Sequence, residues 1–75
     1  MLIKLVYEDS VTIFSGIDSI SVLCEEKKDK VLSVVFKDEK PKLNFVLCKF
    51  EDNSYKDVCS AFLMNEKGET IERLN

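Results

Sequence analysis

Two mostly apolar stretches lie close together near the middle of the chain, Lys30–Phe36 and Leu43–Phe50, and in an extended chain their side chains would point alternately to two faces. This alternation, the β-branched and aromatic residues, and the short length of each run favour strands over helices. The charged segment between the runs contains Pro41, which cannot donate a backbone hydrogen bond to a sheet and therefore suits a loop. The sequence from Lys30 to Phe50 thus predicts a β-hairpin at the middle of a small sheet.

Neither strand of this hairpin has a wholly polar side. In the first strand, Leu32 and Val34 lie on one side, and Val31 and Val35 lie on the other. Strands that are apolar on both sides are usually covered on both, by a second sheet layer, a helix or another subunit. In the second strand the alternation places Leu43, Phe45 and Leu47 on one face and Val46, Cys48 and Phe50 on the opposite face.

Shorter alternating stretches, separated by turn-forming residues, precede and follow the hairpin. Gly16 interrupts one of them near its end, which favours a bulge or a sharp bend at that point. The last stretch is the most polar and predicts an exposed edge strand. These stretches are Leu2–Tyr7, Val11–Ile17, Asp18–Cys24 and Glu69–Leu74.

Residues 54–64 fit two structures. The spacing of one face of an amphipathic helix is met by Tyr55, Val58, Cys59, Phe62 and Leu63. The segment also alternates as a strand, and Asn65–Gly68 after it has the composition of a hairpin turn with a left-handed glycine. We therefore predict a mainly β fold, a small antiparallel meander or barrel of about six to seven short strands. The alternative is α+β, an antiparallel sheet with one helix at about residues 54–64.

The length of 75 residues allows a single small globular domain, residues 1–75. The chain has three cysteines and no histidine. Because no two cysteines have the close spacing of a metal site, we expect neither a metal nor another cofactor. An odd number of cysteines argues against a secreted disulfide scaffold, so we expect a cytoplasmic protein with reduced cysteines buried in its core. No apolar run approaches the roughly 18 residues that would cross a membrane.

The charge is unevenly distributed along the chain. Residues 1–50 hold eight acidic and eight basic residues, whereas residues 51–75 hold six acidic and three basic ones. The net charge of −3 argues against general binding of nucleic acids, which needs a basic surface. Without histidine the commonest general base is missing, and the two glycines are too far apart for a phosphate-binding loop, so we expect no enzyme.

The function that these observations favour is a small non-enzymatic protein-interaction module. A short chain with strands apolar on both sides suggests that another chain covers one face, and an exposed edge strand offers backbone groups for pairing. We expect a protein partner, and a homodimer formed through a sheet face or an edge strand. The apolar candidates for the contact are Val31, Val35, Val46 and Phe50.

Two alternatives remain from the sequence. One is an inhibitor of phage or mobile-element type, whose acidic C-terminal third imitates nucleic acid before a basic groove. The acidic residues of that candidate surface are Glu51, Asp52, Asp57, Glu66, Glu69 and Glu72. The other is a sheet-surface nucleic-acid binder that stacks bases on an aromatic ring beside a lysine. The pairs that would serve it are Phe36–Lys37, Lys49–Phe50 and Tyr55–Lys56.

Overall fold

The computed structural model describes residues 1–75 and contains eight β-strands and no helix. The prediction of a mainly β fold is confirmed, but the number of strands is eight instead of six to seven. The strands are β1 (Leu2–Val6), β2 (Val11–Phe14), β3 (Ile17–Leu23), β4 (Lys30–Phe36), β5 (Leu43–Glu51), β6 (Ser54–Asp57), β7 (Ser60–Met64) and β8 (Thr70–Arg73).

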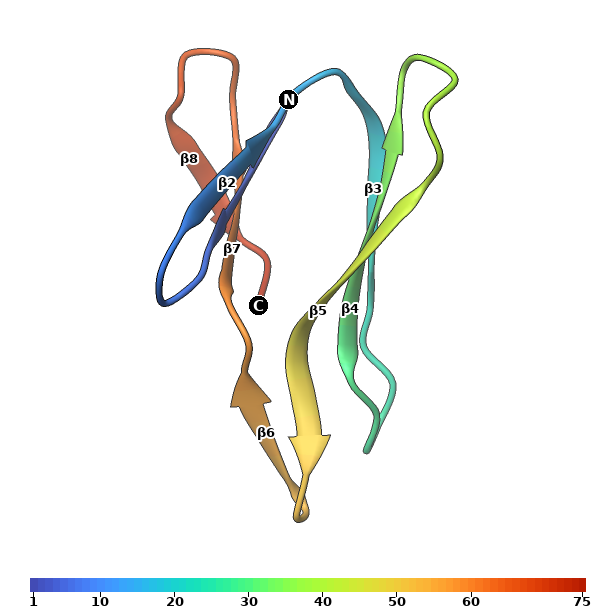
Figure 1. The fold of residues 1–75 in the computed structure, drawn as a ribbon, viewed down its shortest axis with the longest axis vertical. Helices are drawn as coiled ribbons and strands as arrows, with labels where there is room; N and C mark the ends of the chain where they lie inside the picture. Colours follow the sequence, from blue (N-terminus) through green and yellow to red (C-terminus); the bar gives the residue numbers. More distant parts are fainter.

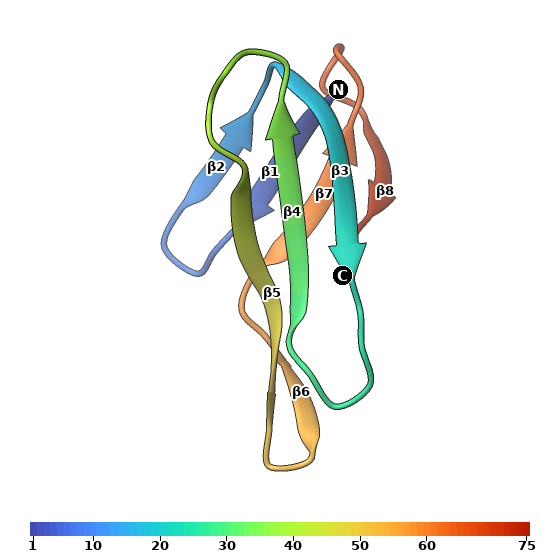
Figure 2. The same ribbon diagram turned by 90° about the vertical axis from the view of Figure 1, so that its right-hand side faces the viewer.

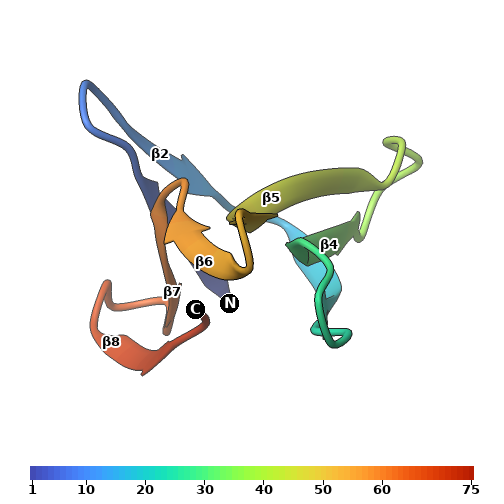
Figure 3. The same cartoon turned by 90° about the horizontal axis from the view of Figure 1, so that it is seen from below.

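The strands form two four-stranded antiparallel sheets (Figure 1). Sheet A has the order β2-β1-β7-β8 and joins the first and last hairpins of the chain through the pairing of β1 with β7. Sheet B has the order β3-β4-β5-β6 and is an uninterrupted meander, with the predicted central hairpin as β4 and β5. Seen from below, the two sheets diverge from each other instead of lying parallel (Figure 3). The two sheets do not join into a closed barrel, so each sheet has two edge strands.

The chain crosses from sheet A to sheet B at Gly16. The stretch Val11–Ile17, expected to be one strand, is divided there, because Gly16 adopts a φ of 67° and turns the backbone. The Gly16 carbonyl accepts a hydrogen bond of 2.8 Å from the backbone N–H of Lys37, which holds the bend against the end of β4. Ile17 consequently lies in sheet B opposite Phe36 and is 2% exposed.

The alternative of a helix at about 54–64 is wrong. These residues form β6 and β7, and the chain returns from sheet B to sheet A between the two strands. At this crossing the Leu47 carbonyl accepts a hydrogen bond of 2.8 Å from the Val58 N–H. The register of β7 places Ala61, which is fully buried, opposite Leu5 of β1. Pairing with β1 therefore overrides the local helical spacing of the segment.

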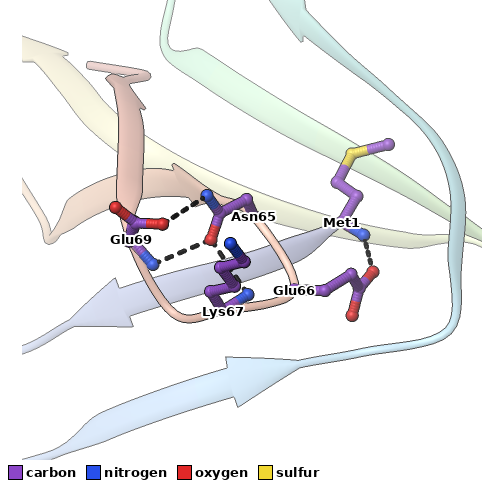
Figure 4. A network of polar contacts seen from close by, with 5 residues as sticks. All are labelled: Met1, Asn65, Glu66, Lys67 and Glu69. Carbon is purple, nitrogen blue, oxygen red and sulfur yellow. Dashed lines mark hydrogen bonds and ion pairs between the residues drawn. The ribbon is translucent and has the colours of Figure 1, made fainter.

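The hairpin turn predicted after β7 is confirmed, and one asparagine organises it (Figure 4). The Oδ1 atom of Asn65 accepts hydrogen bonds of 3.0 Å from the backbone N–H groups of Lys67 and Glu69. Gly68 has a φ of 83°, the left-handed conformation that the turn requires. Glu66, on the outside of the turn, pairs with the N-terminal amine of Met1, which lowers the pKa of its carboxyl group. The turn is thus tied to the start of β1.

The core lies between the sheets and is small, with ten of 75 residues buried. All of the buried side chains are apolar or cysteine, and no buried polar side-chain atom lacks a hydrogen-bond partner. The central buried residues are Ile3 and Leu5 of β1, Leu32 and Val34 of β4, Leu47 of β5 and Ala61 of β7. Cys48 and Cys59 are also buried, but Cys24 is exposed, so the expectation of three buried cysteines is wrong for that residue.

A bulge in β5 changes which residues face this core. Lys30 pairs with Cys48 and Val31 pairs with Val46, so Leu47 has no partner in β4. One extra residue on one strand makes two successive side chains point the same way. Leu47 and Cys48 are therefore both buried, although the sequence pattern places them on opposite faces. No helix of the structure is long and apolar enough to span a membrane.

Candidate interaction surface

The face of sheet B that points away from the core gathers residues from three strands. In β4 the buried Leu32 and Val34 fix the inner face, so the residues between and beside them point outward. The register then aligns outward residues of β3 and β5 with those of β4. Its cross-strand rows, which define the outer face of sheet B, are Leu23, Val31 and Val46; Ser21, Ser33 and Asn44; and Ser19 with Val35.

None of these eight residues carries a charge, although 33% of the chain is charged; the outward-facing charged pair of sheet B, Lys49 and Lys56, lies beyond the bulge on the β5–β6 hairpin. Leu23 is 55% exposed and Val35 is 38% exposed. Ser33 Oγ donates a hydrogen bond of 2.6 Å to Asn44 Oδ1, which holds the polar row in the middle of the face. The part of the outer face that β3, β4 and the first half of β5 form is therefore an uncharged, partly apolar surface open to solvent.

Three of the four apolar contact residues predicted from the sequence lie on this face. Val31 and Val46 are direct cross-strand partners, and Val35 lies further along β4 on the same side. Phe50 does not join them, because the bulge at Leu47 turns it to the other side of β5. Its ring instead packs on Tyr55 of β6, with the ring centres 5.0 Å apart.

The six acidic residues predicted as a second surface do not form one patch. Glu51 and Asp52 lie at the β5–β6 turn, whereas Glu66 and Glu69 lie at the β7–β8 turn, at the opposite end of the molecule (Figure 1). Glu72 lies on β8 in sheet A, and Asp57, at the end of β6, accepts a hydrogen bond from the Cys48 thiol. These carboxylates therefore lie at both ends of the molecule and on β6 and β8, and do not share one surface.

The aromatic residues considered for base stacking have other contacts. The Tyr55 hydroxyl accepts a hydrogen bond of 3.1 Å from the Lys27 N–H and donates one of 3.3 Å to the Glu25 carbonyl. Both contacts hold the β3–β4 loop against the β5–β6 hairpin. Phe36 packs edge-on against Phe14, with ring centres 6.1 Å apart. Both side chains therefore have structural contacts, although Tyr55 remains 50% exposed.

The buried thiols are held in their protonated form. Burial, followed by the hydrogen bond from its Sγ to Asp57, raises the pKa of Cys48 above the ordinary value of 9.0. Burial also raises the pKa of Cys59 and, together with the nearby Cys59 thiol, that of Tyr7. A protonated thiol is a weak nucleophile and a poor metal ligand. No group of three cysteine, aspartate or glutamate side chains is placed to hold a metal ion.

Comparison of the chain with protein-family models, with curated proteins and with solved structures gives no match. The assignment of this surface therefore depends on the residues of the chain itself. Alternation in the sequence already places Ser19, Ser21 and Leu23 on one side of β3. Their alignment with Val31 and Val35 depends on the β3–β4 register.

Proposed function

We propose that this chain is a small non-enzymatic protein-interaction module, and that it binds a second copy of itself through the outer face of sheet B. The observation that carries the proposal is the uncharged character of this face across three strands. A chain that is one-third charged would ordinarily place charged groups on a solvated sheet face. Leu23 and Val35 remain accessible there instead.

Because two copies of the chain have the same net charge, they should meet through uncharged residues, and this face provides them. Each chain carries a net charge of −3, so two copies repel each other at long range. Contact through these eight residues buries no ionisable group, whereas the burial of an unpaired charge would be strongly destabilising. A twofold axis through the row of Ser21, Ser33 and Asn44 would place hydroxyl and amide groups opposite hydroxyl and amide groups. The face is thus chemically complementary to itself, as a symmetric dimer requires.

The small core also supports association. Only ten residues are buried, and large apolar side chains on both sheets stay accessible to water. A domain of this size has little margin of stability, and pairing with another copy is a common way to increase it. The absence of histidine and the raised pKa values of the buried thiols support a role in binding rather than catalysis. The three unpaired cysteines support action in the cytoplasm.

Nucleic-acid mimicry receives less support. A mimic needs carboxylates spaced along one face so that they meet a basic groove together. Here Glu51 and Glu66 lie at opposite ends of the molecule, and both have cationic partners. We therefore propose that the partner binds to the outer face of sheet B and not to the acidic residues.

A single charge placed on the outer face of sheet B tests the proposal. Val35→Glu is tolerated in the monomer, since Val35 is 38% exposed, but in the dimer it buries a carboxylate without a partner. Ile71→Glu on β8 is the matched control, because Ile71 is 61% exposed and lies on sheet A. We expect light scattering to show dimers for the unmodified chain and for Ile71→Glu, and monomers for Val35→Glu. Equal association of all three proteins would refute the role of this face.

A further inference from the structure

Residues of β2, of the ends of β4 and β5 and of the loop between β4 and β5 line a groove. Figure 2 shows β2 and this loop in the same half of the molecule. The groove encloses about 340 Å³, which is the volume range of small binding sites. Its walls are mostly apolar, with one cation and one hydroxyl group. The lining residues are Ile13, Phe14, Ser15, Phe36, Lys40, Pro41 and Leu43.

The groove runs past an unpaired strand edge. β2 is at the edge of sheet A and has only β1 as a neighbour. Phe14 lies opposite the buried Ile3 and points inward, whereas Ile13 lies opposite Lys4 and points outward. Successive residues of a strand point to opposite faces, so a groove lined by Ile13, Phe14 and Ser15 reaches both sides of β2 at its C-terminal end, beside the free edge. Every second residue of such an edge directs its N–H and C=O groups away from the sheet.

The opposite wall has an open edge as well. Residues 43–46 of β5 pair with β4 on one side, and β6 pairs only with residues 48–51. Val11 and Ile13 on β2 are 56% and 55% exposed, and Leu43 is 38% exposed. An exposed, apolar strand without charged residues is a template on which another strand can add. β2, with the sequence Val-Thr-Ile-Phe, has no charged residue to prevent this.

The electrostatics of the groove favour a negatively charged occupant. Lys40 is the one charged residue of the lining, and its ammonium lies 5.8 Å from the centre of the Phe36 ring. Its only ion pair is a loose contact of 3.6 Å with Asp38, in which both side chains are about two-thirds exposed. A carboxylate that enters the groove therefore meets a cation and no lining acid.

From this geometry we infer that the groove and the edge of β2 bind an extended peptide segment of a partner protein. The segment adds as a strand to β2, places a large apolar side chain between Phe14 and Leu43, and directs a carboxylate two residues away to Lys40. Side chains at positions i and i+2 of a strand lie on the same face about 6.6 Å apart, so both can enter one groove. The inference rests on the proposed role as an interaction module, but it does not require two copies to associate.

A blocked peptide of about eight residues tests this inference. It contains leucine and, two residues later, glutamate, with threonine elsewhere. We expect titration of the isotope-labelled protein to shift the backbone amide resonances of Thr12, Ile13 and Leu43. Lys40→Glu should weaken the binding about fivefold or more, and a peptide with lysine in place of glutamate should restore it. Lys67→Glu, which makes the same charge change in the β7–β8 turn, should leave the affinity unchanged.

Methylation of the peptide nitrogens distinguishes strand addition from simple apolar capture. A peptide that is N-methylated at alternate residues keeps its side chains but loses the backbone donors, so it should not bind. Equal binding of the methylated peptide, or equal weakening by Lys40→Glu and Lys67→Glu, would overturn the inference. The inference would also be overturned if the amide resonances of β2 shifted with protein concentration in the absence of peptide, because a second copy would then occupy the edge of β2. Val35→Glu, which should prevent self-association, should bind the peptide with unchanged affinity. The experiments therefore test self-association and peptide binding independently.

Discussion

The carboxamide of Asn75 pairs with the backbone of Ala61 in the manner of a neighbouring strand. Its Oδ1 atom accepts a hydrogen bond of 2.9 Å from the Ala61 N–H, and its Nδ2 atom donates to the Cys59 carbonyl. The Ala61 carbonyl in turn accepts a bond of 2.8 Å from the Leu74 N–H. These contacts satisfy the start of β7 where β8 no longer runs beside it.

Replacement of Asn75 should therefore destabilise the fold. In Asn75→Ala the N–H of the fully buried Ala61 loses its acceptor, and we expect the free energy of unfolding to fall by about 1–3 kcal/mol. Chemical denaturation measures this change. Glu72→Gln, an exposed change on β8, serves as the control and should be neutral. An equal effect of both substitutions would contradict the role of the carboxamide.

Gly68 should be intolerant of a side chain because of its backbone conformation and not because of space. A Cβ atom at this position would lie 3.9 Å from Met64 Cε, an ordinary contact, but the φ of 83° is unfavourable for other residues. We expect Gly68→Ala to lower the free energy of unfolding by about 1 kcal/mol, and Gly68→Asn to lower it less. The order of the two melting temperatures checks this, and the reverse order would show that the strain lies elsewhere.

The buried thiols predict a loss of stability in alkaline solution. The pKa of Cys48 is raised in the folded state, chiefly by burial, so the folded protein holds this proton more tightly than the unfolded chain does. The resulting stability is fully present below the ordinary value of 9.0 and is lost as the pH rises through the folded pKa. Cys59 and Tyr7 act in the same direction.

Denaturation measured at a series of pH values above 9.0 tests this prediction. We expect the free energy of unfolding to decrease with pH in the unmodified chain and to decrease less steeply in Cys48→Ala. Cys24→Ala, which removes the exposed thiol, is the matched control. A slope that is the same in all three proteins would show that Cys48 does not titrate differently in the folded state.

The Tyr55 hydroxyl should control the mobility of the β3–β4 loop. Its bonds to Lys27 and Glu25 link this loop to the β5–β6 hairpin. We expect Tyr55→Phe to lower the free energy of unfolding by less than about 1 kcal/mol, because the site is exposed, and to accelerate amide hydrogen exchange at Lys27 several-fold. Unchanged exchange at Lys27 would mean that other contacts order the loop.

Local patterns in the sequence predict the strands well and the connections between sheets poorly. The hairpin from Lys30 to Phe50 and the turn at Asn65–Gly68 are decided by neighbouring residues, and both are present in the structure. The pairing of β1 with β7 joins residues about 60 positions apart, which no local pattern specifies. The segment at 54–64 shows the consequence, because that pairing decides between strand and helix.

The contrast between local patterns and long-range contacts also applies to the candidate surface. Val31, Val35 and Val46 meet because simple alternation holds along β4 and the first half of β5. The predicted face for Phe50 is wrong because of the bulge at Leu47. Neither glycine nor proline marks this bulge in the sequence, so alternation alone does not reveal it. The groove beside Lys40 could not be predicted, since it forms where β2 approaches a loop that is distant in the sequence.

Sedimentation equilibrium of the unmodified chain at several concentrations tests most directly whether sheet B joins two copies. Over a range from about 10 µM to about 1 mM, mass action should shift the apparent mass from that of one 8.6 kDa chain toward twice that value. High salt should leave the dimer intact or strengthen it, because salt screens the repulsion between like-charged chains and does not weaken apolar contacts. A mass of one chain at every concentration and salt level would contradict the account.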